Sequence, residues 1–247
     1  LLARCYTPSA IIDIYKNELP SIFSKGCLRQ IRGLSKYSNS HLKGLAYDLI
    51  GDITLGEMTQ KILIPAVDTT NRRTIIFKSY DPKYANYKLV DVIIASAAAP
   101  TFFPAHKIGE TWYKDGGLAA NNPSDMLLAE CQDKKLGFDE VNILSITTGV
   151  SEDTVKKSEI KGGLLSVPDM INEVLYLQDL KTHGIVSKQY KNGITKGTYE
   201  RCDSRIFHSS GDIDGVSKSN IKAMIKDGVT SVDFNKKKID NFVKNTI

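Results

Sequence analysis

The sequence predicts an α/β fold: one domain over residues 1–247, in which helices pack on a mostly parallel central sheet. Two observations lead to this prediction. Apolar, β-branched runs typical of strands alternate along the chain with amphipathic stretches of helical spacing. One run, "FDEVNILSITTGV" at residues 138–150, is strongly apolar, as expected of a buried parallel strand. No internal repeat or domain linker interrupts the alternation.

The first part of the chain predicts two helices. Apolar residues recur at helical spacing within residues 7–25, and Ser9, directly after Pro8, is expected to cap this helix. Residues 41–52 predict a second helix. Gly51 is its expected stop signal, because glycine readily takes the backbone conformations that end helices.

Two strands and a helix rich in small residues are predicted next. Residues 61–69 and 73–80 are apolar, β-branched runs separated by a short polar stretch, so they predict adjacent strands. Pro65 in the first run favours an edge or irregular position, because proline lacks the N–H that a strand ladder needs. Residues 88–106 begin as a helix, which Pro100 is expected to end.

The remaining elements are a short strand and several helices. Residues 110–117 predict a strand that runs into two glycines, and residues 122–135 predict the helix that follows it. Residues 162–190 predict a long helix with an apolar stripe between Leu164 and Leu180, typical of a core face, with membrane contact as the alternative. Two late helices are predicted within residues 217–228 and 236–246.

The composition is that of an ordinary globular protein, with 41% hydrophobic and 25% charged residues and a net charge of +5. No apolar run reaches the length of about 18 residues that a membrane span needs, and no signal segment is recognisable. No nucleic-acid module is recognisable either. The four cysteines form no C-x-x-C pair, so we expect reduced, mostly buried thiols and a cytoplasmic location.

The stretch "YKDGGLAANNPSD" at residues 113–125 is the main candidate for a functional site. A strand ending in Asp-Gly-Gly delivers Asp115 to an edge of the sheet, where α/β proteins bind ligands. Gly116 and Gly117 can take positive φ and leave room for another backbone or a substrate. The field of the following helix favours an ionised carboxylate, which can accept a proton from a nucleophile. A simple turn is the alternative.

The wider context resembles the second half of a patatin-like phospholipase. The quoted motif follows "VIIASAAAPTFFPAHKI", which is similar to the family's small-residue helix, proline and aromatic pair. "GDITLGEMTQKILIPAVDTTNRRTIIFKSY" and "NILSITTG" resemble further family segments in the same order. The resemblance covers residues 5–230 and implies a three-layer α/β/α fold and a lipid acyl hydrolase of phospholipase A type. It also implies a Ser–Asp dyad in which Asp115 is the base.

The departures from the family pattern concern the other half of the active site. No G-x-S-x-G nucleophile motif and no Gly-rich oxyanion loop occur in the sequence, and the chain opens on apolar residues without a Met. We therefore expect a single patatin-like domain, residues 1–247, that starts partway into a longer protein and lacks its first strands. In this interpretation the serine lies several residues before Leu1.

The dyad hypothesis assigns roles to several neighbours of Asp115. A carboxylate is a better base when partly desolvated, since desolvation raises its pKa. Asn121 and Asn122 are expected to brace the loop through bonds to backbone. No cofactor or metal is expected. The expected partners are a phospholipid or other acyl-ester lipid and, transiently, a membrane surface. The residues expected to desolvate Asp115 are Trp112, Leu118, Ala119 and Ala120.

Other interpretations stay open. The first is a non-catalytic lipid-binding, storage or interaction protein on the same fold, suggested by the missing nucleophile motif. A second is a His-triad esterase, for which His106 is the best candidate. "SSGDIDGVSKSNI" at residues 209–221 partly matches an EF-hand, but Ile221 stands where the chelating Glu would be, so a turn before a helix is favoured.

Overall fold

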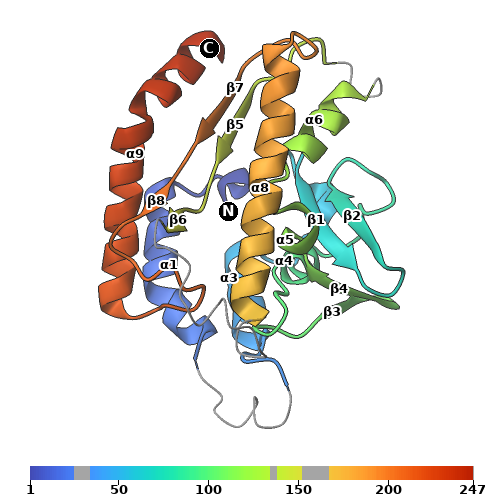
Figure 1. The fold of residues 1–247 in the computed structure, drawn as a ribbon. Helices are drawn as coiled ribbons and strands as arrows, with labels where there is room; N and C mark the ends of the chain where they lie inside the picture. The colour runs from blue at the N-terminus through green and yellow to red at the C-terminus, as the bar shows by residue number, and fades with distance from the viewer. Residues whose placement is uncertain (25–33, 134–137, 152–166, 247) are drawn as a thin grey trace. The chain divides into compact units, whose positions relative to one another are not determined.

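The computed structural model describes residues 1–24, 34–133, 138–151 and 167–246, which Figure 1 draws as a coloured ribbon. The described residues form two compact units, Leu1–Asn121 and Asn122–Ile247. Both units mix helices with strands, so the predicted α/β class is confirmed.

The first unit is built on a four-stranded sheet. Its strands are β1 (Leu63–Asp68), β2 (Arg73–Lys78), β3 (His106–Ile108) and β4 (Thr111–Asp115). Its α-helices are α1 (Pro8–Ile22), α3 (Ser40–Ile50), α4 (Leu89–Ser96) and α5 (Gly117–Ala120). Two short 3-10 helices are η1 (Leu2–Arg4) and η2 (Leu55–Glu57). The strand order is β2-β1-β4-β3, and every neighbouring pair is antiparallel.

This sheet differs from the mostly parallel arrangement that the sequence predicts. Residues 69–72 join β1 to β2, and Gly109 and Glu110 alone join β3 to β4. Connections this short can only reverse the chain, since a parallel pair needs a crossover of about a dozen residues or more. Gly109 has φ of 59°, the left-handed conformation that suits a two-residue hairpin turn.

The second unit contains the parallel pairs. Its helices are α6 (Ser124–Gln132), α8 (Val167–Lys191) and α9 (Lys218–Thr246). Its strands are β5 (Ile143–Ile146), β6 (Val150–Ser151), β7 (Tyr199–Cys202) and β8 (Arg205–Ile206). β5 pairs with β7 and β6 with β8, both in parallel, which confirms the direction predicted for residues 138–150. Burial alternates along β5, however: Ile143 is 3% exposed and Ile146 is 71% exposed.

Two of the predicted helix ends can be compared with the structure. α1 is capped by Thr7 rather than by Ser9: Thr7 Oγ1 accepts a hydrogen bond from the backbone N–H of Ala10 at 3.2 Å. Pro8 takes the first helical position, where a missing N–H costs nothing. Gly51 follows the last residue of α3 as predicted, with φ of 80°.

Three further expectations are wrong. Pro65 lies in a central strand, β1, instead of at an edge; it is tolerated because the ladder to β4 begins only at Ala66. One helix, α9, replaces the two predicted late helices. On α8, Met170, Val174 and Leu177 are each half or more exposed, so the core interpretation fails for this part of the stripe, while Leu164 lies outside the described residues. Helical spacing shows that a face is apolar but not what covers it.

Each unit has its own apolar core. In the first, the fully buried Phe77 packs against the rings of Tyr84, Tyr87 and Tyr113, with centroids 5.3, 5.8 and 5.3 Å away. The second has a smaller core made of Leu128, Val141, Ile143 and Val186. Within the described ranges, no helix is both long enough and apolar enough to cross a bilayer.

A buried carboxylate ties α9 to the segment that precedes it. Asp227, in the middle of α9, is 5% exposed. Its oxygens accept hydrogen bonds from the backbone N–H groups of Phe207, His208 and Ser209, and from the Ser209 hydroxyl at 2.8 Å. Burial alone would raise the pKa of Asp227, but the bonds from Ser209 and His208 hold this pKa well below its usual range.

Asp227→Asn should therefore lower the free energy of unfolding by about 1.5–3 kcal/mol, since an amide presents one acceptor oxygen to several donors. Folding lowers the pKa of Asp227 from its value of about 3.9 in the unfolded chain. Such a carboxyl group stabilises the folded state fully at pH values above about 3.9. This contribution is lost as the pH falls from there towards the pKa in the folded state. Urea denaturation should therefore show a smaller difference in the free energy of unfolding between the wild type and Asp227→Asn at about pH 3 than at neutral pH. Asp240→Asn, at an exposed site of the same helix, should change stability by less than about 0.5 kcal/mol. Equal effects of the two changes would contradict the role of Asp227.

Candidate active site

Asp115 is the last residue of β4, and backbone hydrogen bonds fix it against the end of α4. Asp115 pairs with Ala66 of β1 in the sheet register. Its own N–H donates to the Ala98 carbonyl at 3.1 Å, and the N–H of Gly116 donates to the Ser96 carbonyl at 3.0 Å. The sheet therefore holds Asp115 from one side and the α4 terminus from the other.

Gly116 is required for a close backbone approach rather than for its torsion angles. Its φ is −67° and Gly117 begins α5, so the expectation that these glycines use positive φ is not met. A Cβ on Gly116 would lie 2.1 Å from the carbonyl oxygen of Pro65. The hydroxyl of Ser96 donates to that same oxygen at 2.8 Å. Sequence analysis missed this junction of Pro65, Ser96 and Gly116, because its members come from three separate segments.

Gly116→Ala should lower the free energy of unfolding by about 1–3 kcal/mol, because the new methyl group meets backbone that is held in a sheet. Gly44→Ala is the matched control. Gly44 lies inside α3 with no atom within 4 Å of an added Cβ, so this change should stabilise the protein by about 0.5–1 kcal/mol. Thermal or urea denaturation checks both values. A Gly116→Ala variant as stable as the wild type would show that the close approach is unnecessary.

Within the described residues, one oxygen of the Asp115 carboxyl group accepts a hydrogen bond, and the other accepts none. Oδ1 accepts the N–H of Gly117, the first residue of α5, at 2.6 Å. Burial raises the pKa of Asp115, and the bond from Gly117 opposes this shift only in part. Of the residues expected to desolvate it, Ala120 is buried. Trp112 is 48% exposed and, three residues away along β4, lies on the opposite face of the strand.

Asn122 connects the end of the motif to α6. Its side chain is 5% exposed, and its Oδ1 accepts the N–H of Ser124, the first residue of α6, at 3.1 Å. This bond satisfies one of the free N–H groups at the helix start. The Nδ2 of Asn122 is buried and has no hydrogen-bond partner in the part of the chain that the structure describes. Asn121 directly follows α5.

Three of the four histidines contact groups other than Asp115. His106 Nε2 lies 2.9 Å from Oδ1 of Asp91 on α4, and the same oxygen accepts from Lys43 Nζ at 2.8 Å. Burial alone would raise the pKa of Asp91, but Lys43 and His106 together lower it. Among the described residues no hydrogen bond joins His106 to Asp115. His183 contacts the Tyr199 hydroxyl, and His208 contacts Asp227.

The described ranges contain no group of three or more His, Cys, Asp or Glu side chains that suits a metal ion. The segment that partly matches an EF-hand is instead a braced turn before α9. Asn220 Oδ1 accepts the N–H of Ser210 at 2.7 Å, and its Nδ2 donates to the Gly215 carbonyl at 2.6 Å. Cys5 is exposed, unlike the buried thiols that the sequence predicts.

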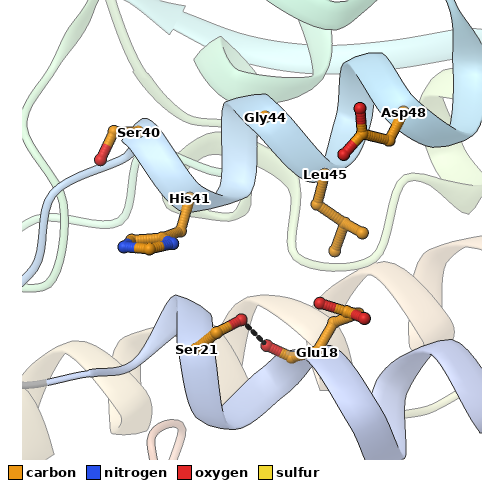
Figure 2. Close-up of a pocket in the computed structure, with 7 residues that line it drawn as sticks. All are labelled: Glu18, Ser21, Ser40, His41, Gly44, Leu45 and Asp48. Atoms are coloured by element: carbon orange, nitrogen blue, oxygen red, sulfur yellow. Dashed lines mark hydrogen bonds between the residues drawn. The ribbon is translucent and has the colours of Figure 1, made fainter.

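A depression of about 340 Å³ lies between α1 and α3 (Figure 2). Figure 2 shows His41 and Leu45 of α3 pointing toward α1, where the Ser21 hydroxyl donates to the Glu18 carbonyl at 2.7 Å. Five of its seven lining residues have polar side chains, which suits an acyl chain poorly, and no lining residue comes from the Asp115 loop. We therefore assign it no role in the site. The lining residues are Glu18, Ser21, Ser40, His41, Gly44, Leu45 and Asp48.

Comparison with known proteins finds patatin-like proteins and phospholipases. The family model described as "Patatin-like phospholipase" matches residues 1–128, a range that includes the whole Asp-Gly-Gly motif. "Patatin-like protein 2" of Oryza sativa subsp. indica is 27% identical over 284 aligned positions, covering 95% of this chain and 69% of the rice protein. A "cGAMP-activated phospholipase" of Escherichia coli (strain TW11681) is 34% identical over 157 positions, covering 59% of this chain and 44% of that protein. A protein of the same name from Vibrio cholerae is 25% identical over 236 positions, covering 82% of this chain and 64% of its own length.

Proposed function

Because the chain belongs to the patatin-like phospholipase family, we propose that the protein containing it hydrolyses acyl esters of lipids with a Ser–Asp dyad in which Asp115 is the base. The reaction is of phospholipase A type, on phospholipids or related acyl-ester lipids. The observation that carries the proposal is the carboxyl group of Asp115. It is anchored through Oδ1 to Gly117, its Oδ2 is available, and burial raises its pKa.

The proposed mechanism divides the work between this chain and a segment upstream of Leu1. Asp115 accepts the proton of a serine hydroxyl from that segment as the oxygen attacks the ester carbonyl. N–H groups of a Gly-rich loop, also upstream, stabilise the oxyanion. The protonated Asp115 then gives its proton to the departing alkoxide. In the second half it activates the water that releases the fatty acid from the acyl-serine.

The structure around Asp115 suits this cycle in two ways. The base must stay in place while its protonation changes twice, and the backbone bonds of Asp115 and Gly116 to α4 hold it there. The base must also be stronger than an exposed aspartate, which burial provides. The substrate lies in membranes, so we include transient contact with a membrane surface from the cytoplasmic side in the proposal.

The pH dependence of kcat/KM tests the identity of the base. Asp115 must be ionised to accept a proton, so the rate should rise with pH and level off above its pKa. Burial raises this pKa, so the midpoint should lie above the ordinary aspartate value of about 3.9. Ester release from phospholipid vesicles between about pH 3 and 9 gives the profile. A midpoint near neutral pH that disappears in His106→Gln would instead identify a histidine base.

A second candidate function is favoured by one observation: residues 1–247 contain no G-x-S-x-G sequence. In this alternative the protein is a non-catalytic lipid-binding, storage or interaction protein on the same fold. Labelling the intact protein with a fluorophosphonate separates the two. A modified serine upstream of Leu1 supports the enzyme, whereas the absence of any modified serine supports the binding protein.

A further inference from the structure

An apolar stripe runs along α9 between its buried side and its charged, solvent-facing side. α9, drawn in red in Figure 1, turns Asp227, Ser231 and Asn235 inward, and all three are buried. Beside this buried side, Val229 is 61% exposed and Val232, one turn before Asn235, is 58% exposed. None of these residues belongs to the site described around Asp115.

These valines belong to a regular stripe, which we call the α9 seam. Its residues are Ile225, Val229, Val232, Lys236, Ile239 and Val243. The spacing alternates between four and three residues over the whole stripe, which is the repeat of helices that pair as coiled coils. Five of the six side chains are β-branched and apolar. Val243 is 46% exposed, while Ile225 and Ile239 are half-buried.

We propose that the α9 seam is a dimer interface, in which the α9 helices of two copies of this chain pack antiparallel about a two-fold axis. The surface is then self-complementary, as an isologous interface requires. Aligning the seams places Ile225 against Val243 of the second copy, Val229 against Ile239, and Val232 against Lys236. All six seam residues of each copy are paired in this alignment.

The single lysine of the seam selects the antiparallel orientation. In a parallel pair, equivalent positions face each other, so the two Lys236 ammonium groups would meet inside the seam. In the antiparallel pair Lys236 lies beside Val232 of the second copy and next to its Asp233. A single charged residue at such a position is a common device for fixing the register and orientation of a coiled coil.

Charges beside the seam agree with the antiparallel arrangement. The residue directly after Ile225, Val232 or Ile239 lies at the edge of the seam. These three flanking residues are Lys226, Asp233 and Asp240. In the antiparallel pair, Lys226 of one copy faces Asp240 of the other, on both sides of the axis. The two Asp233 carboxylates come together near the axis, where the two Lys236 side chains offset their repulsion.

The observations favour a second copy over a membrane as the partner. A helix that lies on a bilayer typically has aromatic or leucine side chains on its apolar face, with basic residues around them. The seam has neither type of apolar residue, and two of its three flanking positions are acidic, Asp233 and Asp240, with Lys226 at the third. Carboxylates at that position would be repelled by anionic headgroups but can pair with lysines of a second copy.

The size of the seam predicts a weak dimer. From residue 225 to residue 243 the helix is about 27 Å long, or fewer than three heptads. Such an interface lies at the low end of the range for specific complexes. We therefore expect dissociation in the micromolar range and a dimer fraction that rises with protein concentration.

Sedimentation velocity over a dilution series tests the interface. The wild type should shift from monomer to dimer as its concentration rises, and Val232→Glu should be monomeric throughout. Asn241→Glu adds the same side chain on the same helix outside the seam, and it should dimerise like the wild type. Circular dichroism should show that both variants are folded. A wild type that is monomeric up to about 100 μM, or a Val232→Glu variant that still dimerises, would overturn the proposal.

Charge exchange tests the orientation. Lys236→Glu and Asp233→Lys should each raise the dissociation constant about tenfold or more, and the double exchange should restore it to within a few-fold of the wild type. A double variant as weak as the single ones would contradict the antiparallel pairing. Flotation with vesicles of equal parts phosphatidylcholine and phosphatidylglycerol tests the rival partner. If Val232→Glu abolishes vesicle binding and leaves self-association unchanged, the seam is a membrane contact and the dimer proposal is wrong.

Discussion

Replacing Asp115 by Asn is expected to lower the rate of ester release by about 10²- to 10⁴-fold, the range typical for loss of a general base. An amide has nearly the same shape as a carboxyl group and still accepts the N–H of Gly117 through its Oδ1. It cannot accept a proton from a hydroxyl. The measurement is release of fatty acid from phospholipid by the protein that contains both this chain and the proposed upstream serine.

Stability distinguishes this catalytic loss from simple unfolding. Burial raises the pKa of Asp115, so at neutral pH its ionised form is less favourable in the folded protein than in the unfolded chain. Asp115→Asn removes that charge and should leave the free energy of unfolding equal or slightly higher. Asp125→Asn, in the first turn of α6, is the matched control and should retain activity. Activity of Asp115→Asn within a few-fold of the wild type would rule out the dyad.

Arg201→Met should lower the free energy of unfolding by about 3–5 kcal/mol, the cost typical of breaking a buried ion pair. Arg201 on β7 is buried, and its Nη1 donates to Asp179 Oδ1 on α8 at 2.9 Å. Its Nε donates to Asp203 at 2.6 Å, and its carbonyl accepts Lys238 Nζ of α9. Without the guanidinium, Asp179 becomes a buried carboxylate with no cation.

A double variant and a control make this result specific. Arg201→Met with Asp179→Leu removes both charges, so most of the lost stability should return. Arg205→Met, on the next strand along the chain, β8, removes an exposed arginine that lies over the Phe234 ring, and it should cost less than about 1 kcal/mol. Urea denaturation measures all three. A double variant no more stable than Arg201→Met would contradict the account of this pair.

The local features of the fold could be predicted from the sequence, and its sheet geometry could not. Gly51 ends α3, and the runs at 61–69 and 73–80 pair, because both depend on residues close in the chain. The short polar stretch between these runs already favoured an antiparallel pair, but the pairing of β1 with β4 joins segments about fifty positions apart, and nothing in either segment indicates it. The short strands β7 and β8 have too few residues for a pattern, and sequence analysis missed both.

The same division applies to the candidate site. Asp115 could be found from its motif, and its position at the end of a strand follows from the apolar residues before it. The contact of Gly116 with Pro65 joins residues about fifty positions apart, and nothing in either segment indicates it. The α9 seam could be read from the printed sequence by its alternating spacing. Only the exposed fractions of its valines, Val229, Val232 and Val243, show that part of it is open to solvent.

The central claim is that Asp115 takes the proton of a serine hydroxyl, and the most direct test is the distance between the two groups. A crystal structure of the intact protein provides it. The account predicts a serine Oγ within about 2.6–3.2 Å of Asp115 Oδ2, with Oδ1 still bound to the N–H of Gly117. An Asp115 whose second oxygen meets solvent or backbone, with no serine hydroxyl in reach, would contradict the account.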